Sequence, residues 1–384
     1  MGIPAEYTGR EQAYVKHSIL KTYLTRLFMI IGRGETVINY VDCFAGPWED
    51  ETDDLRSTSI GISLNQIKLC AGALRKNFNK TVKFRVLYIE KDPDAFRKLN
   101  AFLQKQNHSS IEVSCMEGDY SSLIPDILKW CGDAFTFFFV DPKGWKRIIG
   151  GKTLEPLLNL ERSEFLINLM YDFANRAVGI DKHEEDIIEL LGEKIEYSGD
   201  ETAVERQDIF LSTYRKNINK YYGGRTAFVP IERPGKDRVL YFLIYLTRHP
   251  LGINVFKEDS EKMLLVQRIT QQETKLRKQQ ESAPILDLFA DEEVEVNIKP
   301  EDNRCAAKSY LLKTITDKPC LIDYETWSRF LEDTDLYPTD FQLAMKELVK
   351  EKKMVNVDAD ITKRRTKIIK PHWPNKSEHW KKCL

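Results

Sequence analysis

The sequence has few of the features that mark exported, membrane-spanning or metal-binding proteins. No uninterrupted apolar run reaches the about 18 residues that a membrane-spanning helix needs, and residues 1–12 are polar, unlike a signal peptide. The seven cysteines are scattered, with no C-x-x-C pair and no matching histidine spacing, so the usual zinc and iron–sulfur patterns are absent. We therefore expect a cytoplasmic protein with reduced thiols and no metal.

The chain also lacks an excess of charge of either sign. Its 58 lysine and arginine residues and 59 aspartate and glutamate residues give a formal net charge of −1. No global field therefore attracts a polyanion, and a nucleic-acid partner must bind a local basic patch. With 384 residues, 42% of them hydrophobic, the chain is long and apolar enough for two folded units with buried cores.

The most informative stretch is V-I-N-Y-V-D-C-F-A-G-P-W, residues 37–48. Hydrophobic, β-branched and aromatic residues continue up to Asp42, and Phe44, Ala45 and Gly46 then begin a turn, which is typical of a buried parallel strand and its end. In open α/β sheets, ligands bind outside the carboxyl ends of the strands, where a glycine lets the backbone approach a nucleoside. The turn is therefore either a cofactor site or an ordinary strand end.

An amphipathic helix precedes this strand. Apolar residues recur at three- and four-residue steps from about residue 12 to residue 31, and the helix stops near Gly32 and Gly34. Its apolar face should cover the sheet. Lys16 and His17, near its start, either face the turn after the first strand or have a structural role, which is the commoner case for a lone helical histidine.

Two further strands end in acidic residues. The strand at 84–89 is followed by Glu90, which is either placed to accept hydrogen bonds from ribose hydroxyls or is a solvated acid in its loop. The strand at 111–116 is followed by Asp119, whose carboxylate is placed to meet an exocyclic amino group at the adenine end of the crevice. Asp119 or Ser121 also suits a helix N-cap, and the two roles are compatible.

The fourth strand, residues 135–140, is the most apolar part of the chain, so we expect it at the centre of the sheet. Asp141 follows it at the middle of the crevice and is the best catalytic candidate. Pro142 fixes the turn, and Trp145 offers a flat surface for a base or a sulfonium. A fifth strand at 164–170 leads into a polar and aromatic cluster, residues 171–176, at the same edge.

The rest of the first domain is predicted to be a helical excursion and two closing strands. The excursion covers residues 181–222, and the strands at 226–231 and 239–247 should pair antiparallel at the edge of the sheet. A polar helix at about 255–281 then leads into residues 281–302. Those residues contain eight acids and one base, which is typical of a solvated linker.

The tail from residue 304 has the pattern of a winged helix. We expect helices at about 306–315, 324–331 and 339–350 and strands at 354–357 and 366–369. Eight bases and one acid lie between residues 361 and 384, and with Trp373 and Trp380 they suit phosphate binding and base stacking. The central candidates for nucleic-acid binding are Lys363, Arg364, Arg365 and Lys367. A module that binds a protein instead is the alternative.

Four segments of the chain resemble the three-Cys-motif partner protein family. They are K-H-x-I-L-x-x-Y-L (Lys16 to Leu24), Y-V-D-C-F-A-G-P (Tyr40 to Pro47), F-V-D-P-K-G (Phe139 to Gly144) and T-R-H-P-L-G-I (Thr247 to Ile253). The resemblance implies a class I S-adenosylmethionine-dependent methyltransferase-like domain, often followed by a winged helix, and association with radical-SAM-type proteins that carry a three-cysteine motif. The D-x-F-A-G-P and D-P-x-G elements are also similar to amino-methyltransferases acting on adenine in nucleic acid.

The resemblance implies the following roles. The cofactor's methionine part is lined by Asp42, Phe44, Ala45 and Gly46, its ribose by Glu90 and its adenine by Asp119, while Asp141 and Pro142 meet the acceptor amine. Two positions depart from the amino-methyltransferases: Trp48 replaces a second glycine, and Lys143 with Gly144 replaces the Pro-aromatic pair of a D-P-P-Y motif. Stacking on a flipped adenine must then come from Trp145 or from elsewhere.

We therefore predict an α/β protein in three parts. A Rossmann-like, doubly wound methyltransferase sheet spans residues 1–256, a helix and acidic linker 257–303, and a winged-helix domain with a basic tail 304–384. The leading function is S-adenosylmethionine-dependent methylation of a nucleic acid, DNA or RNA, at an amino group, with Asp141, Pro142 and Trp145 at the catalytic position. The alternative is a non-catalytic partner that binds the cofactor or a nucleotide and delivers nucleic acid or a radical-SAM-type protein.

Overall fold

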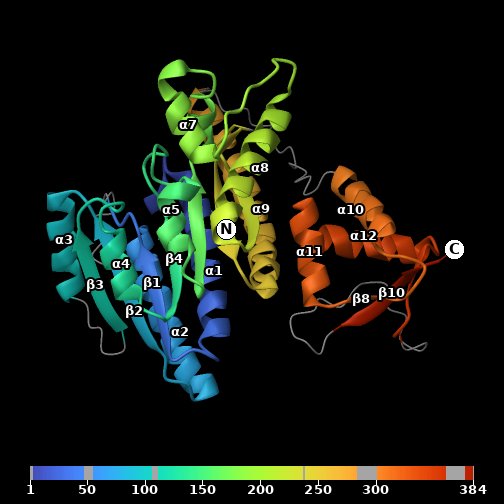
Figure 1. Cartoon of the computed structure of the whole chain (residues 1–384), viewed down its shortest axis with the longest axis horizontal. Helices are drawn as coiled ribbons and strands as arrows, with labels where there is room; N and C mark the ends of the chain where they lie inside the picture. The colour runs from blue at the N-terminus through green and yellow to red at the C-terminus, as the bar shows by residue number, and fades with distance from the viewer. Residues whose placement is uncertain are drawn as a thin grey trace. The chain divides into compact units, whose positions relative to one another are not determined.

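The chain forms two compact units, Met1–Arg248 and His249–Leu384. The structure, a computed structural model, describes residues 3–46, 55–105, 111–236, 238–282, 301–359 and 377–383. Figure 1 shows the first unit as a twisted sheet with helices packed against it and the second as a smaller helical unit with short strands.

The first unit is built on a seven-stranded sheet with the order β3-β2-β1-β4-β5-β7-β6. The strands are β1 Val37–Asp42, β2 Lys83–Glu90, β3 Ile111–Glu117, β4 Phe135–Val140, β5 Ser163–Leu169, β6 Arg225–Glu232 and β7 Val239–Thr247. The first five are parallel, and β7 runs antiparallel to both β5 and β6. The predicted doubly wound α/β class and the predicted antiparallel closing pair are both confirmed.

Strand order places a topological switch point between β1 and β4. From β1 the chain moves outward to β2 and β3, and it then returns to place β4 on the other side of β1. Every residue of β4 is buried, as its apolar sequence predicted. Ligands of open α/β sheets bind outside the carboxyl ends of strands at such a point.

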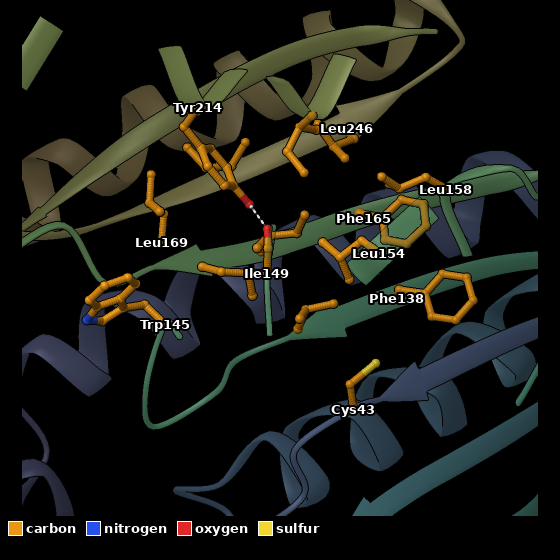
Figure 2. Close-up of a cluster of buried hydrophobic side chains, with 14 of the residues drawn as sticks. Cys43, Phe138, Trp145, Ile149, Leu154, Leu158, Phe165, Leu169, Tyr214 and Leu246 are labelled. Atoms are coloured by element: carbon orange, nitrogen blue, oxygen red, sulfur yellow. Dashed lines mark hydrogen bonds between the residues drawn. The ribbon is translucent and has the colours of Figure 1, made fainter. Parts of the chain in front are cut away.

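Helices cover both faces of the sheet (Figure 1). They are η1 Ala5–Tyr7, α1 Glu11–Ile31, α2 Ser59–Phe78, α3 Pro93–Lys105, α4 Ile124–Cys131, α5 Gly151–Leu158, α6 Tyr171–Asn175, η2 Asp181–His183, α7 Glu184–Leu191 and α8 Ala203–Tyr222. On one face Phe28 of α1 packs against Phe84 of β2, with ring centroids 5.3 Å apart. On the other face Phe138 of β4 joins a hydrophobic cluster with α4, α5 and α8 (Figure 2). The sequence prediction missed α5.

Local capping explains where several helices begin and end. The Thr58 hydroxyl accepts a hydrogen bond from the Gly61 amide at the start of α2. Thr202 and Glu205 form a reciprocal capping box at the start of α8. Gly223, with φ of 62°, ends α8 in the left-handed conformation that glycine adopts at no steric cost. These signals lie in the sequence, which is why the helical excursion was predictable.

A buried carboxylate fixes α1 to the sheet. Glu164 of β5 accepts hydrogen bonds from Tyr23 of α1 at 2.9 Å, from Tyr245 of β7 at 2.8 Å and from Thr247 at 2.8 Å. Burial raises the pKa of Glu164, and these hydrogen bonds oppose the shift. Because α1 is held at this point, the side chains of its first turns are also held over the carboxyl ends of the strands.

The second unit combines helices with a small antiparallel sheet of order β8-β10-β9. Its elements are α9 Pro250–Ser282, α10 Glu301–Thr314, β8 Cys320–Ile322, α11 Tyr324–Thr334, α12 Pro338–Lys350, β9 Met354–Asn356 and β10 Glu378–Lys382. The strand predicted at 366–369 lies outside the described residues, and the strand that pairs with β9 is β10. Trp380 of β10 is fully buried, so the prediction that it stacks on bases is wrong.

The division between the units falls at Arg248, before the boundary that we expected at residue 256. Helix α9, which we placed in a linker, packs against α11 and α12 inside the second unit. Lys257 is fully buried there and donates a hydrogen bond to the backbone oxygen of Asp335 at 2.8 Å. The acidic stretch 283–300 lies outside the described residues. Among the described helices, none is both long and apolar enough to cross a membrane.

Candidate active site

A cavity of about 490 Å³ opens at the carboxyl ends of the central strands of the first unit. Its lining comes from the start of α1, the turn after β1, the start of α2 and the turn after β4. The end of β5, helix α6, the residue after β6 and the start of β7 complete it. The volume lies within the range of sites for small molecules and cofactors. The cavity therefore occupies the place that the switch point predicts for a ligand.

The turn after β1 is closely packed against the end of β2. The Ala45 amide donates to the backbone oxygen of Ile89 at 2.8 Å. A Cβ atom added at Gly46 would collide with the carboxylate of Glu90. Glycine is thus required here because an acid from the neighbouring strand fills the space where a side chain would lie, and both Ala45 and Gly46 line the cavity.

Asp42 lies beneath this turn and is fully buried. Its Oδ1 accepts a hydrogen bond from the Phe44 amide at 3.2 Å, and its Oδ2 has no hydrogen-bond partner among the described residues. Burial raises the pKa of Asp42 to about 7, although the Ser59 side chain and the Phe44 amide, which stabilise the ionised form, oppose the shift. Phe44 lines the cavity above it and packs against Tyr120.

Glu90 and Asp119 do not themselves line the cavity. Glu90 is buried and accepts a hydrogen bond from the Asp92 amide at 2.8 Å. Its carboxylate lies against Gly46, which lines the cavity. Asp119 is exposed and accepts hydrogen bonds from the Ser121 amide at 3.0 Å and the Ser121 hydroxyl at 2.5 Å. The Ser121 contacts lower the pKa of Asp119. Asp119 therefore caps the turn that leads into α4, the structural role considered for it.

Asp141 lies in the cavity with both carboxylate oxygens engaged. Lys16 of α1 donates to Oδ2 at 2.5 Å, and Asn168 of β5 donates to Oδ1 at 2.6 Å. The side chains of Asp141 and Lys16 are 17% and 14% exposed, and the Lys16 ammonium lies 5.8 Å from the ring of Tyr241. The carboxylate is thus oriented by partners from two other elements.

The sequence contains a signal for each of the two hydrogen-bond partners of Asp141. Lys16 was considered as a residue facing the first turn, and it lies in the same cavity as that turn. Asn168 was missed, although a single polar residue inside the apolar run of β5 was a usable signal. Its Oδ1 is buried and has no hydrogen-bond partner among the described residues.

His17 is buried beside Lys16 and lines the same cavity. Burial, followed by the positive charge of Lys16, lowers the pKa of His17 to about 3. Its Nδ1 lies 3.2 Å from the hydroxyl of Tyr7. His17 is therefore neutral at physiological pH and has a hydrogen-bond partner, as expected for the structural alternative.

Of the residues after Asp141, the structure brings Pro142 and Lys143 to the cavity but not Trp145. Trp145 is 6% exposed and belongs to the hydrophobic cluster shown in Figure 2. It offers no flat surface to a ligand in the cavity. Phe173, in the aromatic cluster noted after β5, does line the cavity and is 49% exposed.

Several predicted features lie outside the described residues. They are Trp48 and the basic candidates Lys363, Arg364, Arg365 and Lys367. Within the part of the chain that the structure describes, no group of three or more His, Cys, Asp or Glu side chains is placed to hold a metal ion. All seven cysteines are free thiols.

No family model matches the chain, and no curated protein matches it. Solved structures similar to it include a DUF574 family protein from Streptomyces avermitilis, at 11% identity and a TM-score of 0.31, covering 59% of this chain and 81% of that one. A proposed methyltransferase from Thermobifida fusca gives 11% identity, a TM-score of 0.30, and 61% and 82% coverage. Loganic acid methyltransferase with SAH gives 9% identity, a TM-score of 0.31, and 73% and 92% coverage. Likeness at this level assigns neither cofactor nor substrate.

Proposed function

We propose that this protein is an S-adenosylmethionine-dependent methyltransferase that acts on an amino group of a nucleic acid. The observation that carries the proposal is one cavity, at the switch point of a doubly wound sheet, that joins the Gly46 turn to an oriented carboxylate, Asp141. The first feature suits a nucleoside-containing cofactor and the second suits an amine.

The residues around the turn fit the cofactor chemically. Gly46 lines the cavity with its backbone and carries the Glu90 carboxylate against its Cα, and the partnerless Oδ2 of Asp42 is a buried acceptor suited to a positively charged group. Glu90, whose carboxylate lies against Gly46, is the candidate for the ribose hydroxyls. Asp119, which does not line the cavity, is the candidate for the adenine amino group from the family resemblance alone. When bound, S-adenosylmethionine supplies an electrophilic methyl group on a positively charged sulfur.

The role of Asp141 is to orient the acceptor amine. An amine attacks through its lone pair, so no strong proton acceptor is required, and positioning accounts for most of the rate gain. Lys16 and Asn168 each occupy one position on an Asp141 oxygen. A carboxylate oxygen accepts more than one hydrogen bond, so each can still receive an N–H of the substrate. Pro142 lines the cavity beside it.

The second unit is proposed to hold the polymer. Its chain order, α10, β8, α11, α12, β9 and β10, with β10 between β8 and β9, agrees with the winged helix expected from the sequence. The basic residues Lys363, Arg364, Arg365 and Lys367 are the proposed phosphate contacts.

A second function is favoured by the same contacts of Asp141. Lys16 and Asn168 already donate to both oxygens of Asp141, so this carboxylate has hydrogen-bond partners without an acceptor amine. The sequence also has Lys143 and Gly144 where amino-methyltransferases have a Pro-aromatic pair. These features suit a non-catalytic partner that binds the cofactor or a nucleotide. Such a partner would deliver nucleic acid or, as the family resemblance implies, a radical-SAM-type protein.

Two measurements separate the functions. Calorimetry with S-adenosylmethionine tests for cofactor binding, and transfer of a labelled methyl group to mixed DNA and RNA tests for catalysis. Binding with transfer supports the enzyme. Binding without transfer to any nucleic acid supports the non-catalytic partner, and absence of binding refutes the assignment of the cavity as a cofactor site.

A further inference from the structure

An exposed aromatic ring lies at the cavity on the side of β5. Helix α6 begins at Tyr171 directly after β5, and its first turns place Phe173 in the cavity lining with 49% of the residue exposed. The guanidinium carbon of Arg176 lies 4.9 Å from the centre of the Phe173 ring. A single exposed apolar residue is ordinary on a protein surface, but this ring belongs to a cavity that also holds Asp141.

Three arginines, of which Arg176 lies over this ring, converge on the buried carboxylate of the preceding residue, Asp172. Asp172 is 3% exposed, forms a short ion pair with Arg238, and lies 3.3 Å from Arg176 and 4.0 Å from Arg233. The Arg176 and Arg238 side chains are 57% and 55% exposed. Each guanidinium carries five N–H donors, so Asp172 engages only part of each and leaves Arg176 and Arg238 donors facing solvent.

Most of the charged residues that line the cavity are basic. Among the described residues that line it, Arg10, Lys16, Lys143 and Arg233 are basic, and Asp141 is the one acid. A flat apolar ring beside a guanidinium group, in a basic surrounding, is a combination that binds unpaired nucleotides: the ring stacks on the base, whatever its identity, and the cations contact the phosphates.

We propose that Phe173 stacks on the base of an unpaired target nucleotide and that Arg176 and Arg238 bind its flanking phosphates, with Asp172 holding both arginines in place. This rests on the proposed function in taking the substrate to be a nucleic acid, and it narrows that substrate to a single-stranded or flipped-out nucleotide. It also identifies the stacking surface that the sequence assigned to Trp145, which the structure places in the core.

The test measures binding, without turnover, to the full chain. The probe is a fluorescein-labelled single-stranded oligonucleotide of about five nucleotides, near the lower end of single-strand site sizes, which limits the contribution of distant basic residues. Anisotropy is compared for wild type, Phe173→Ala, Phe173→Trp and Arg176→Gln. Arg162→Gln is the matched control, because Arg162 has similar exposure, 52%, and lies just before β5, at its opposite end.

Phe173→Ala should weaken binding about tenfold or more, the scale of losing one base-aromatic stack, whereas Phe173→Trp should retain it. Arg176→Gln should reduce the slope of log affinity against log salt by about 0.7, the value for one phosphate contact with a single strand. Arg162→Gln should change neither. A wild-type far-UV circular dichroism spectrum and cooperative thermal unfolding show that each variant is folded.

Equal affinity of wild type and Phe173→Ala overturns the proposal, as does a wild type that does not bind the probe. Methyl transfer that survives Phe173→Ala at the wild-type rate refutes this stacking role while leaving the proposed function intact. Binding that depends on Phe173 in a protein that transfers no methyl group has the opposite meaning: the nucleotide site stands, and the methyltransferase assignment fails.

Discussion

Replacement of Asp141 by alanine tests whether the carboxylate of this residue has a catalytic role or a structural one. The change removes the ion pair with Lys16 and the hydrogen bond from Asn168. Hydrogen bonds to charged groups contribute about 1.5–3 kcal/mol each, and because both side chains of the ion pair are slightly exposed, we expect a combined loss of about 2–3 kcal/mol. For a unit of this size, that loss lowers the melting temperature by roughly 5–10 °C.

The catalytic effect should exceed the structural one. In a folded Asp141→Ala protein, S-adenosylmethionine binding measured by calorimetry should change by only a few fold, while labelled-methyl transfer falls by about 10² or more, the scale of deleting a positioned catalytic group. Asp141→Asn keeps an acceptor for Asn168 but removes the charge, so it should lose most of the transfer with less loss of stability than the alanine variant.

Lys16→Met is the matched comparison. It breaks the same ion pair from the other side but leaves the carboxylate in the cavity, still held by Asn168. We expect a similar fall in melting temperature and a smaller loss of transfer than in Asp141→Ala. If a well-folded Asp141→Ala protein transfers methyl groups at the wild-type rate, Asp141 is not catalytic. If the two variants lose transfer and stability in the same proportion, its role is structural.

Further predictions concern the cofactor and the tail. Glu90→Ala should weaken S-adenosylmethionine binding by about 1.5–3 kcal/mol, and calorimetry showing equal affinity would remove Glu90 from the ribose role. Asp42 loses its proton as the pH rises through about 7, so affinity for the positively charged cofactor should rise across that pH and Asp42→Asn should abolish the rise. An unfolded aspartate has a pKa of about 3.9, so the raised pKa of Asp42 makes the free energy of unfolding of the wild type fall as the pH rises from about 4 to 7. This fall should be smaller in Asp42→Asn. Melting temperatures of the two proteins that change in parallel over this pH range would contradict the prediction. Charge reversal at Lys363, Arg364 and Arg365 should weaken binding of long nucleic acids and flatten its salt dependence, and an unchanged gel-shift salt slope would exclude the tail.

The cavity could be located from the sequence because parallel strands share an edge. The hydrophobic runs at 37–42 and 135–140 predicted central strands, and the residues after them had to meet at the carboxyl ends. Asp42, Gly46 and Asp141 were found in this way. Lys16 was suggested by the helical pattern of α1, but its partner, 125 residues away in sequence, depends on how α1 docks on the sheet.

The direction of individual aromatic side chains was not predictable. Trp145 and Phe173 both follow a strand that ends at the cavity, yet Trp145 packs into the core and Phe173 stays exposed. The difference depends on the path of each turn and on α5, whose Leu154 packs in the same cluster as Trp145 and which the sequence did not reveal. The prediction for Trp380 was wrong for a similar reason: the face of β10 that is buried depends on the pairing of β10 with β8 and β9.

Asp42, which is buried beneath the cavity, and Asp141, which lines it, have different environments, and the difference supports different proposed roles. Asp42 is fully buried, accepts a hydrogen bond from the Phe44 amide and has a raised pKa because burial outweighs the contacts with Phe44 and Ser59. Asp141 is partly exposed and has an ammonium and an amide as partners. Carboxylates whose environments differ in this way commonly divide the work of a site. Under the proposed function, a cationic cofactor would stabilise the ionised form of Asp42, which has no cationic partner within hydrogen-bonding distance among the described residues. Asp141, whose orientation is already fixed by Lys16 and Asn168, would then be the carboxylate that meets the acceptor amine.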